Sequence, residues 1–525
     1  MSPRSMLYVI LGYLLGYSIA ISPPRYSKCN SKDFGHGGTV CVCSDQFCDS
    51  FTSGEPLSAQ EYAVYTSSKA GDRFNLTTGR FSKTLGVKST ETVIKLAVNK
   101  SVTFQSILGF GGAFTDAASI NIHNISDSLK EKLLDSYFSD MGIEYTIGRI
   151  PMASCDFSTR PYSYNDHEGD LAMANFSLAQ EDLNLKIPLI LYARMKSKRN
   201  IFMFGSPWSA PAWMKTNDKM TGFGQLKGKA GDKYHKAWAL YFAKFLEAYK
   251  EKGVDVQAVT VQNEPSDGFI PFFKFQCMGY TAKMERDFIK EDLGPTLAAR
   301  GHGDVKIIML DDQRIFLSSW AETILSDPVA AKFVSGIGVH WYMDKFEPAT
   351  VLTDTHNKFP DHFILSTEAC NDPLTSKTPI VSLGDWSRGN KYSHSIIEDL
   401  SNWSTGWVDW NLALNMEGGP NWVKNFVDSP IIVDAENGLF YKQPMFYHLG
   451  HFSKFVPAGS KRIKVTANDQ SSLQFIGFTT PSPYASTVVV VLNTSDQEIA
   501  LEIHDEDLGV IRETVPASSI QTYIW

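Results

Sequence analysis

Positive charge is scarce in this sequence, and motifs that define several other classes of protein are absent. Its 525 residues include 49 lysines and arginines against 57 aspartates and glutamates, a formal net charge of −8. Because a nucleic-acid partner requires clustered lysine and arginine side chains, we exclude one. The sequence has no G-x-S-x-G nucleophile elbow and no H-E-x-x-H zinc helix, and its 12 histidines are scattered. We therefore expect neither a bound metal nor another cofactor.

Long apolar runs are missing after the first twenty residues. Arg4 is followed by an apolar stretch over residues 6–19 and by small residues at 18–20. This pattern predicts a secretory signal peptide over residues 1–20, with a retained signal anchor as the alternative. No later stretch approaches the roughly 18 apolar residues that a membrane helix needs. We expect the chain to enter the secretory pathway, where disulfides and glycans form.

Cysteine is scarce too, and four of the seven cysteines lie close together near the start of the mature chain: Cys29, Cys41, Cys43 and Cys48. Four cysteines allow three pairings. Cys41 and Cys43, two apart in an extended segment, should point to one side and pair with different partners, so we favour Cys29–Cys41 and Cys43–Cys48. A zinc site is the rival, but no matching histidine pair follows. The others are expected to be reduced and buried: Cys155, Cys277 and Cys370.

Six Asn-x-Ser/Thr sequons indicate a glycosylated protein. One sequon arises easily by chance, but six behind a signal peptide favour glycosylation. Their asparagines are Asn75, Asn99, Asn124, Asn175, Asn402 and Asn493.

The body of the chain repeats one pattern, in which a short apolar run ends in polar or aromatic residues and a helix-like stretch usually follows. The runs end near residues 109–112, 149–151, 206–208, 263–265, 310–312, 339–341, 366–368 and 409–411. Between several of them lie amphipathic segments, such as residues 235–252. Eight such units predict an α/β fold of the (β/α)8 TIM-barrel class, with the chemistry at the strand ends. A doubly wound sheet is the alternative, but no G-x-G-x-x-G follows the first strand.

The two ends of the chain read differently, as short strand patterns separated by turn residues. They predict a β-sandwich assembled from both chain ends. We assign three regions after the signal peptide: a small disulfide-containing β segment over residues 21–58 with 412–443, the β-sandwich over 59–104 with 460–525, and the barrel over 105–411 with 444–459.

Two glutamates stand directly after strand-like runs. Glu264 follows the run that begins at Val259, and Glu368 follows the run that begins at Phe363. By the order of the runs they close strands four and seven, which lie across the barrel mouth from each other. A carboxylate there is expensive to desolvate, so each is either salt-bridged, a helix cap or functional. Two carboxyls that face one space suit glycoside hydrolysis, with one as nucleophile and the other as acid.

Other strand ends carry residues that fit the same chemistry. Asn263, beside Glu264, is placed to hydrogen-bond a sugar 2-hydroxyl. Arg149 and Arg314 close strands two and five, where either could hold a carboxylate in its charged form. His340 closes the next strand, and we expect it to support the pair.

Several segments resemble glycoside hydrolase family 30, and within it the members that cleave glucosylceramide. Residues 263–265 and 366–370 are similar to the acid/base and nucleophile segments of that family. The similarity runs across almost all of the mature chain, including residues 41–43, 109–117, 149–158, 310–314, 409–415 and 418–422.

The resemblance implies a role for each matching residue. Glu264 is expected to be the general acid/base and Glu368 the nucleophile of a retaining hydrolase. The residues expected to bind glucose or to surround the pocket are Asp156, Phe157, Trp208, Asn263, Phe273, Phe275, Tyr342, Trp410 and Asn425. Aspartate and asparagine suit sugar hydroxyls, whereas tryptophan and phenylalanine cover the apolar ring face.

The resemblance also implies partners and a location. They are glucosylceramide in a membrane surface, a saposin-type activator with anionic lipid, and a lysosomal integral-membrane transport receptor. The location is the lysosome, peripheral on its lumenal membrane, with partial secretion as a variant. The alternatives are a family member for another sugar, such as a β-xylosidase or a β-1,6-glucanase, and a non-catalytic carbohydrate- or receptor-binding relative.

Two features depart from the resemblance. Phe273 stands where the vertebrate members carry a tyrosine. The segment over residues 371–377 lacks the aromatic pair that those members carry after the nucleophile. We therefore expect the contacts with the lipid part of the substrate to differ from those in the vertebrate members.

Overall fold

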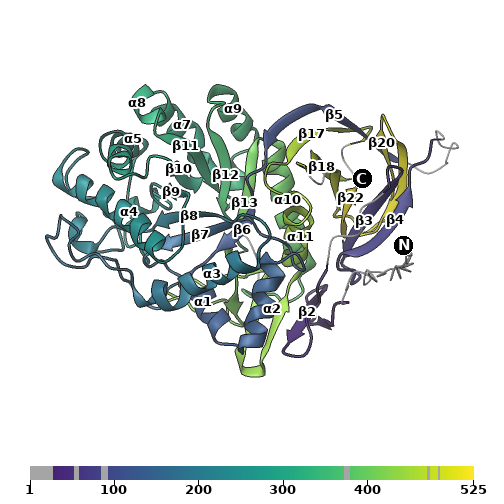
Figure 1. The fold of residues 1–525 in the computed structure, drawn as a ribbon, viewed down its shortest axis with the longest axis horizontal. Helices are drawn as coiled ribbons and strands as arrows, with labels where there is room; N and C mark the ends of the chain where they lie inside the picture. The colour runs from purple at the N-terminus through teal and green to yellow at the C-terminus, as the bar shows by residue number, and fades with distance from the viewer. Residues whose placement is uncertain (1–27, 52–57, 84–92, 372–378, 470–472, 483–484) are drawn as a thin grey trace, which may run out of the picture.

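Eight parallel strands close into a barrel in the larger part of the molecule (Figure 1). The computed structural model describes residues 28–51, 58–83, 93–371, 379–469, 473–482 and 485–525. The barrel strands follow one another in chain order. They are β6 (Gly109–Ala113), β7 (Ile147–Met152), β8 (Phe202–Pro207), β9 (Ala258–Thr260), β10 (Lys306–Gln313), β11 (Val334–His340), β12 (Phe363–Glu368) and β13 (Ser404–Asn411). The predicted TIM barrel is confirmed.

Helices cover the outside of this barrel (Figure 1). The helix predicted over residues 235–252 is α4 (Lys233–Glu251). It begins earlier than predicted because the Asp232 carboxylate caps its first turn, accepting from the backbone N–H groups of Tyr234 and His235. The other helices are α1 (Asp116–His123), α2 (Asp127–Phe138), α3 (Ile187–Lys196), α5 (Ala282–Phe288), α6 (Gly294–Ala299), α7 (Leu317–Leu325), α8 (Pro328–Ala331), α9 (Thr350–Lys358), α10 (Trp386–Ser401) and α11 (Pro444–Ser453).

The barrel interior is filled in layers. Six strands each contribute one apolar side chain to a single buried cluster: Ile147, Phe204, Ala258, Ile308, Leu365 and Val408. Because side chains alternate along a strand, the residue two positions further on faces the same interior. In β7, β8 and β9 that residue is polar, namely Arg149, Ser206 and Thr260, and the three are hydrogen-bonded through Ser206. The apolar layer thus supports a buried polar layer nearer the carboxyl ends of the strands.

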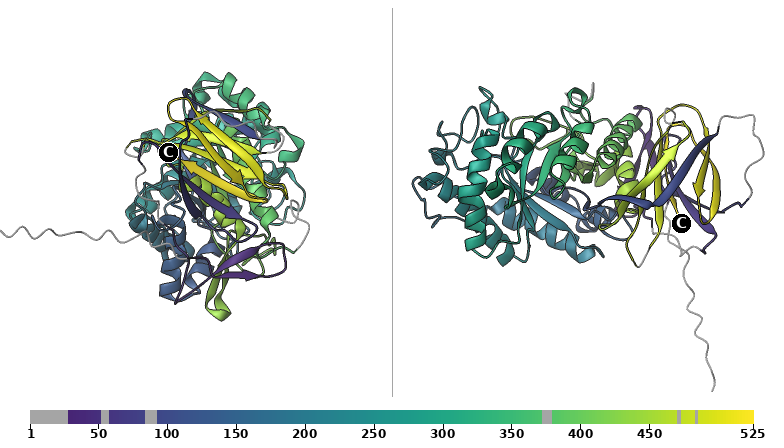
Figure 2. Two further views of the ribbon diagram at one scale, coloured as in Figure 1. Left: turned by 90° about the vertical axis from the view of Figure 1, so that its right-hand side faces the viewer. Right: turned by 90° about the horizontal axis from the view of Figure 1, so that it is seen from above.

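Strands from both chain ends form a second, smaller unit beside the barrel (Figures 1 and 2). One sheet runs in the order β21 (Gly509–Val515), β20 (Ile499–Asp505), β5 (Ile94–Ser106), β17 (Lys461–Ala467), β18 (Gln474–Thr479), β19 (Thr487–Asn493), β22 (Ser519–Ile524), β3 (Glu61–Ser68) and β4 (Asn75–Arg80). The sheet folds over on itself, since Tyr62 Oη on β3 donates to Glu513 on β21 at 2.8 Å. Apolar side chains from both halves, including Val64 and Ile511, share one core. The predicted β-sandwich is confirmed.

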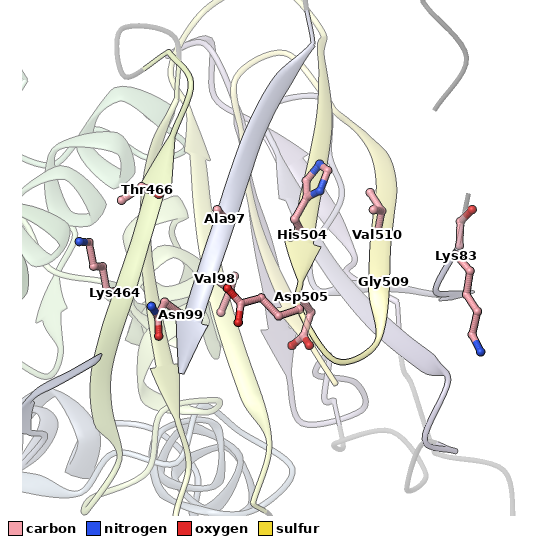
Figure 3. A pocket seen from close by; sticks show the side chains of 12 residues that line it. Lys83, Ala97, Val98, Asn99, Lys464, Thr466, His504, Asp505, Gly509 and Val510 are labelled. Carbon is pink, nitrogen blue, oxygen red and sulfur yellow. The ribbon is translucent and has the colours of Figure 1, made fainter. Parts of the chain in front are cut away.

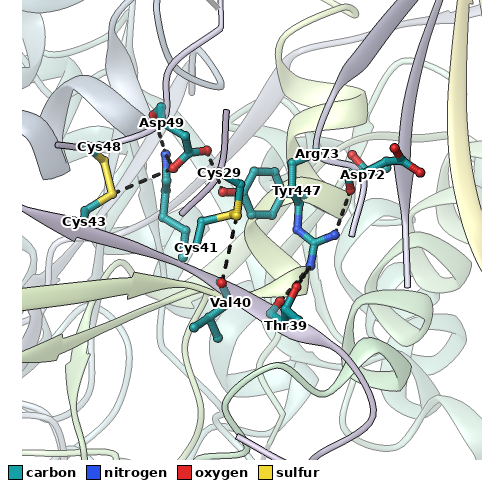
Figure 4. Close-up of a disulfide and its surroundings, with 12 residues drawn as sticks. Cys29, Thr39, Val40, Cys41, Cys43, Cys48, Asp49, Asp72, Arg73 and Tyr447 are labelled. Carbon is teal, nitrogen blue, oxygen red and sulfur yellow. Dashed lines mark hydrogen bonds and ion pairs between the residues drawn. A yellow bond between two sulfur atoms is a disulfide. The ribbon is translucent and has the colours of Figure 1, made fainter. Parts of the chain in front are cut away.

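A third, small sheet joins the start of the chain to a segment that follows the last barrel strand, over residues 414–442. Its order is β1 (Ser31–Asp33), β2 (Thr39–Ser44), β16 (Leu439–Lys442), β15 (Ile431–Asp434) and β14 (Leu414–Asn415). The disulfides Cys29–Cys41 and Cys43–Cys48 confirm the predicted pairing (Figure 4). The Asp49 carboxylate pairs with Lys442 at 2.7 Å and accepts from Tyr447 Oη at 2.7 Å, so buried ionic contacts also hold the segment. The three other cysteines are buried thiols, as predicted: Cys155, Cys277 and Cys370.

The sequons differ in accessibility. Asn75, Asn124 and Asn175 are exposed, and Asn99 and Asn402 are partly buried. Asn493 is fully buried on β19, and its amide donates to the backbone carbonyls of residues 497 and 516 at 2.8 and 2.9 Å. A glycan at Asn493 conflicts with this folded environment, because the amide nitrogen that would carry it is enclosed and bonded.

Two predictions concern residues outside the described ranges. They are the signal peptide over residues 1–20 and the loop over residues 371–377, of which the structure describes only Asn371. Within the described part of the chain, no helix combines the length and the apolar character needed to cross a membrane.

Candidate active site

The two predicted carboxyls meet at the carboxyl ends of the barrel strands. Glu368 is the last residue of β12, and Glu264 follows β9, which ends at Thr260. One carboxylate oxygen of each and a ring nitrogen of His340 all lie within 4.8 Å of one another. Retaining glycosidases hold their carboxyls about 5–5.5 Å apart, whereas inverting enzymes need about 6.5–9.5 Å to admit a water molecule. The pair therefore has the close spacing of a double-displacement site.

The backbone of Glu264 adopts an unusual conformation. Its φ of 41° lies in the left-handed region, which residues other than glycine rarely adopt. Its N–H donates to the carbonyl of Asp311 on β10 at 2.9 Å, and its own carbonyl accepts from the N–H of Asp267 at 3.0 Å. These bonds hold the strained residue where its side chain reaches the central space.

Arg149 connects the pair to the polar layer of the barrel. It is fully buried, and its guanidinium donates to Glu368 Oε2, to Asn263 Oδ1 at 2.7 Å and to Asp311 Oδ2 at 2.9 Å. A buried guanidinium needs partners for both its charge and its donors, and two carboxyls and an amide supply them. A negative charge on Glu368 is therefore well stabilised.

His340 bridges Glu264 and the deeper Asp311. Its Nδ1 lies 3.2 Å from Glu264 Oε1, and its Nε2 lies 3.0 Å from Asp311 Oδ1. Burial lowers the pKa of His340, but the charge of Glu368 and the bonds to Asp311 and Glu264 outweigh it and raise the pKa to about 10. His340 is therefore a cation at neutral and acidic pH. Gln313 Nε2 adds a second donor to Glu264 Oε1, at 2.9 Å.

The two carboxyls are perturbed in opposite directions. Burial raises the pKa of Glu368, and the charge of Glu264 adds to the rise, although Arg149 and His340 oppose it. Burial acts upward on Glu264 as well, but the hydrogen bond and the charge of His340 outweigh it and lower the pKa. The two carboxyls act on each other, so they titrate as a pair.

Polar and aromatic side chains next to the pair are suited to a sugar ring. The Asp156 carboxyl accepts from Asn425 Nδ2 at 3.0 Å and from Asn421 Nδ2 at 3.1 Å. Burial raises the pKa of Asp156 to about 7 despite these two bonds, so at acidic pH it can also donate to a hydroxyl. The indoles of Trp208 and Trp410 stack with centroids 5.1 Å apart, and both rings lie beside the Arg149 guanidinium.

The remaining predicted residues lie beside the pair or along a neighbouring groove. Tyr342 Oη donates to Glu368 Oε1 at 2.8 Å, and Phe157 packs edge-on against the Trp410 ring. Phe273 and Phe275 contact each other edge to face, with centroids 4.5 Å apart. Both line a groove of about 350 Å³ whose other lining residues come from residues 270–275 and 423–425.

The structure does not bring Arg314 to the pair. Gln313, at the end of β10, points to Glu264, and alternation sends the next side chain the other way. Arg314 instead pairs with Asp344 at 3.1 Å, Glu398 at 3.1 Å and Asp399 at 3.4 Å. The prediction that it supports the pair is wrong, because its charge is used by this separate group.

Three polar residues of the site had no predicted role: Asp311, Gln313 and Asn421. The adjacent carboxyls of Asp311-Asp312 after an apolar run were the available signal for Asp311, because a buried strand seldom carries two carboxyls without partners, whereas Gln313 gave no such signal. Nothing in the sequence around Asn421 indicates a role in the site, because it is the loop between β14 and β15 that places Asn421 beside Asp156.

Glu264, His340 and Glu368 also offer three atoms of the kind that ligate metals. The guanidinium of Arg149 on Glu368 and the positive charge of His340 both repel a cation at that point. The residues fit proton transfer and nucleophilic attack better than they fit a metal ion.

A second hollow of about 460 Å³ lies on the β-sandwich (Figure 3). Its lining comes from β5, β17, β20, β21 and the residues after β4, including His504, Asp505 and Lys464. None of these elements belongs to the barrel, so the hollow is separate from the carboxyl pair.

Several buried carboxyls make folding stability depend on pH. Burial raises the pKa of Asp156, Glu285 and Asp312 to about 7, and that of Asp399 to about 6. The folded protein holds protons that the unfolded chain, with carboxyl pKa values near 4, has released. Such a group adds stability that is complete below the unfolded pKa and is lost as the pH rises through the folded pKa.

We expect the free energy of unfolding to be higher at pH 6 than at pH 8, by about 1 kcal/mol for each carboxyl that titrates near 7. Burial lowers the pKa of His451 to about 3 and that of His448 well below its usual range, and both act in the opposite sense below the ordinary histidine pKa of about 6.5, so they offset part of the difference at pH 6. Denaturant unfolding at the two pH values measures the difference. Glu285→Gln removes one of these carboxyls and should reduce it, and equal stability of the unmodified chain at both pH values would contradict the prediction.

The fold and the carboxyl pair together define a retaining glycoside hydrolase built on a TIM barrel. Comparison with known families agrees, since residues 107–456 match the glycosyl hydrolase family 30 TIM-barrel domain and residues 459–523 match the family's beta sandwich domain. The chain belongs to glycosyl hydrolase family 30.

Individual relatives extend this result. The chain is 50% identical to the lysosomal acid glucosylceramidase of Mus musculus over 500 residues, which cover 95% of each protein. It is similar to the crystal structure of SrfJ from Salmonella typhimurium, with a TM-score of 0.79 and 30% identity over 89% of this chain and 99% of that one. The endo-β1,6-glucanase BT3312, at 23% identity and a TM-score of 0.77, shares the fold over 88% of this chain and 99% of its own.

Proposed function

We propose that this protein hydrolyses the β-glucosidic bond of glucosylceramide, by double displacement through a covalent glucosyl-enzyme. The observation that carries the proposal is the close carboxyl pair, in a barrel whose chain is half identical to a lysosomal acid glucosylceramidase. Glucose release from glucosylceramide by the purified mature protein, near pH 5 with anionic phospholipid, tests it. Cleavage of a soluble aryl β-glucoside with the lipid left untouched would keep the chemistry and reject the substrate.

In the proposed mechanism Glu368 attacks the anomeric carbon and Glu264 protonates the leaving oxygen. In the reacting state Glu264 carries the proton and Glu368 is the anion. Arg149 and Tyr342 both donate to Glu368, which supports its anionic form. Water, deprotonated by Glu264, then hydrolyses the glucosyl-Glu368 ester.

Glucose recognition is assigned to the polar and aromatic side chains beside the pair. Asp156 and Asn425 present hydrogen-bonding groups to the hydroxyls, while the Trp208 and Trp410 rings cover the apolar face. Asn263, oriented by Arg149, is next to Glu264 and suits the 2-hydroxyl. A bond to that hydroxyl strengthens as positive charge develops on the sugar.

The rim of the barrel mouth favours a lipid substrate. Phe272, Phe346 and Phe223 follow the carboxyl ends of three barrel strands and are 95%, 63% and 54% exposed. Exposed lysines stand among them: Lys274, Lys345 and Lys424. An apolar rim with positive charges is suited to an anionic membrane surface, although the chain as a whole is acidic.

The proposal includes a setting for this reaction. The chain acts in the lysosome, at the lumenal membrane surface, and a saposin-type activator and an integral-membrane transport receptor are its proposed protein partners. Support for this setting comes from the named mouse relative and from the raised pKa values of buried carboxyls, which favour an acidic compartment.

Replacing two rim residues, Phe272→Ser with Phe346→Ser, should lower turnover of glucosylceramide in anionic vesicles by at least about tenfold, since full burial of even one phenylalanine is worth about 1.5–3 kcal/mol. Hydrolysis of a soluble aryl β-glucoside should not change, because neither side chain touches the carboxyl pair. Met195→Ser is the matched control, as Met195 is 69% exposed at the end of α3, on the opposite side of the barrel. Equal losses on both substrates would reject a membrane role for the rim.

A further inference from the structure

A second carboxyl lies against the proposed acid/base. Asp267 opens a short 3₁₀ turn, η3 (Asp267–Phe269), three residues after Glu264. Its N–H donates to the Glu264 carbonyl at 3.0 Å, and the N–H of Ile270 donates to its own carbonyl at 2.9 Å. This turn folds the segment back, so that the side chains of Asp267 and Glu264 are hydrogen-bonded to each other.

A hydrogen bond between two carboxyls requires a proton, because two carboxylates can only accept. Glu264 already receives donors from the cation His340 and from Gln313, which favour its charged form. Asp267 receives no such donor from the described part of the chain, and its neighbour Asp312 adds another acidic group. The proton of the bond therefore belongs to Asp267.

The titration environment agrees with this placement. Burial raises the pKa of Asp267 well above its usual range, and the charges of Glu264 and Asp312 add to the rise. The side chain of Asp312 is held in place by a hydrogen bond, since its Oδ2 accepts from the N–H of Ser266 at 3.0 Å. These surroundings favour the protonated, donating form of Asp267.

We propose that Asp267 is a positioning residue for the acid–base step, a protonated carboxyl that donates to Glu264 and so sets the pH at which Glu264 gives up its proton. In that step the Glu264 O–H bond breaks, the proton goes to the glycosidic oxygen, and the electron pair of the breaking C–O bond stays on that oxygen. Asp267 keeps its own proton and stabilises the carboxylate that Glu264 becomes. The inference rests on the acid/base role proposed for Glu264.

Other titratable groups also lie around the two carboxyls. They are Arg149 on β7, Asp311 and Asp312 on β10, His340 on β11, Glu368 on β12, and Cys277 with Lys215 behind the turn. An Asp267 variant leaves all of them in place. A change in the pH profile can therefore be assigned to the removed carboxyl.

The test is the pH dependence of kcat/KM for an alkyl β-glucoside, whose poor leaving group needs protonation. Asp267→Ala should move the alkaline limb to higher pH by about one unit, because Glu264 loses a donor to its carboxylate. Asp267→Asn should restore the limb to within about 0.3 units, since an amide N–H can donate in place of the acid. Asp304→Ala, at an exposed aspartate before β10, should leave the profile unchanged.

Three outcomes would overturn the inference or its basis. An unshifted limb in a folded Asp267→Ala protein removes the positioning role, and a downward shift in both variants makes Asp267 a charge instead of a donor. If the alanine protein does not fold, Asp267→Ser removes the carboxyl with a side chain too short to reach. A dinitrophenyl β-glucoside needs no acid, so an identical alkaline limb on both substrates in the unmodified protein would reject the role of Glu264 itself.

Discussion

Glu368→Gln should abolish formation of the glucosyl-enzyme and lower kcat by about 10⁴-fold or more, because the amide cannot attack the anomeric carbon. The fold should persist, since the glutamine carbonyl can accept from Arg149 while its amide N–H donates to the Tyr342 hydroxyl, which now donates to the carboxylate. Intact-protein mass spectrometry after reaction with a cyclitol epoxide measures this directly. We expect one added inhibitor on the unmodified protein and none on the variant.

Peptide mapping of the labelled protein decides between the two possible assignments. Label on Glu368 supports the proposed roles, whereas label on Glu264 would exchange them. Glu436→Gln, at an exposed glutamate on the turn between β15 and β16, should label like the unmodified protein. Covalent labelling of a folded Glu368→Gln variant would reject Glu368 as the nucleophile.

Glu264→Ala should lower kcat/KM on alkyl glucosides by about 10²–10⁴-fold, the usual contribution of a general acid. On dinitrophenyl β-glucoside the glucosyl-enzyme should still form quickly, because that leaving group departs without a proton. Its hydrolysis should then be slow, because no base activates water, and azide should restore turnover by attacking the glucosyl-enzyme directly.

Comparison of the two substrates separates an acid role from a structural one. Equal loss on both, with no effect of azide, would show that the substitution disturbs the site as a whole. Glu251→Ala, at the exposed end of α4, provides the matched control and should change neither rate.

The repeated apolar runs that end in polar residues were enough to predict much of the fold and of the site from the sequence. A strand buried on both faces needs a continuous apolar run, and a polar residue can follow only where the run leaves the core. Eight such transitions therefore predicted the barrel, and two of them placed Glu264 and Glu368 at one end of it. The cysteine pairing was predicted for a similarly local reason, since neighbours two apart on a strand share a face and cannot pair with each other.

Contacts between distant segments were decided only by the tertiary structure. Arg149 lies within β7 and Arg314 directly follows β10, and the first enters the barrel and meets Glu368, while the second turns outward to Asp399. A shift of one residue along a strand decides between the two directions, because alternation reverses the direction of a side chain at each residue. Strand boundaries read from sequence are not sharp enough to choose between them.

Burial and protonation were decided in the same way. Asn493 carries the same sequon as Asn175, yet one is enclosed by the sandwich and the other is exposed. The bond between Asp267 and Glu264 depends on a turn that holds Glu264 at a positive φ, which no spacing of residue types indicates. Residue types determined what chemistry this chain can perform, whereas the packing of strands far apart in sequence decided which groups meet, because proton affinity depends on neighbours and not on identity alone.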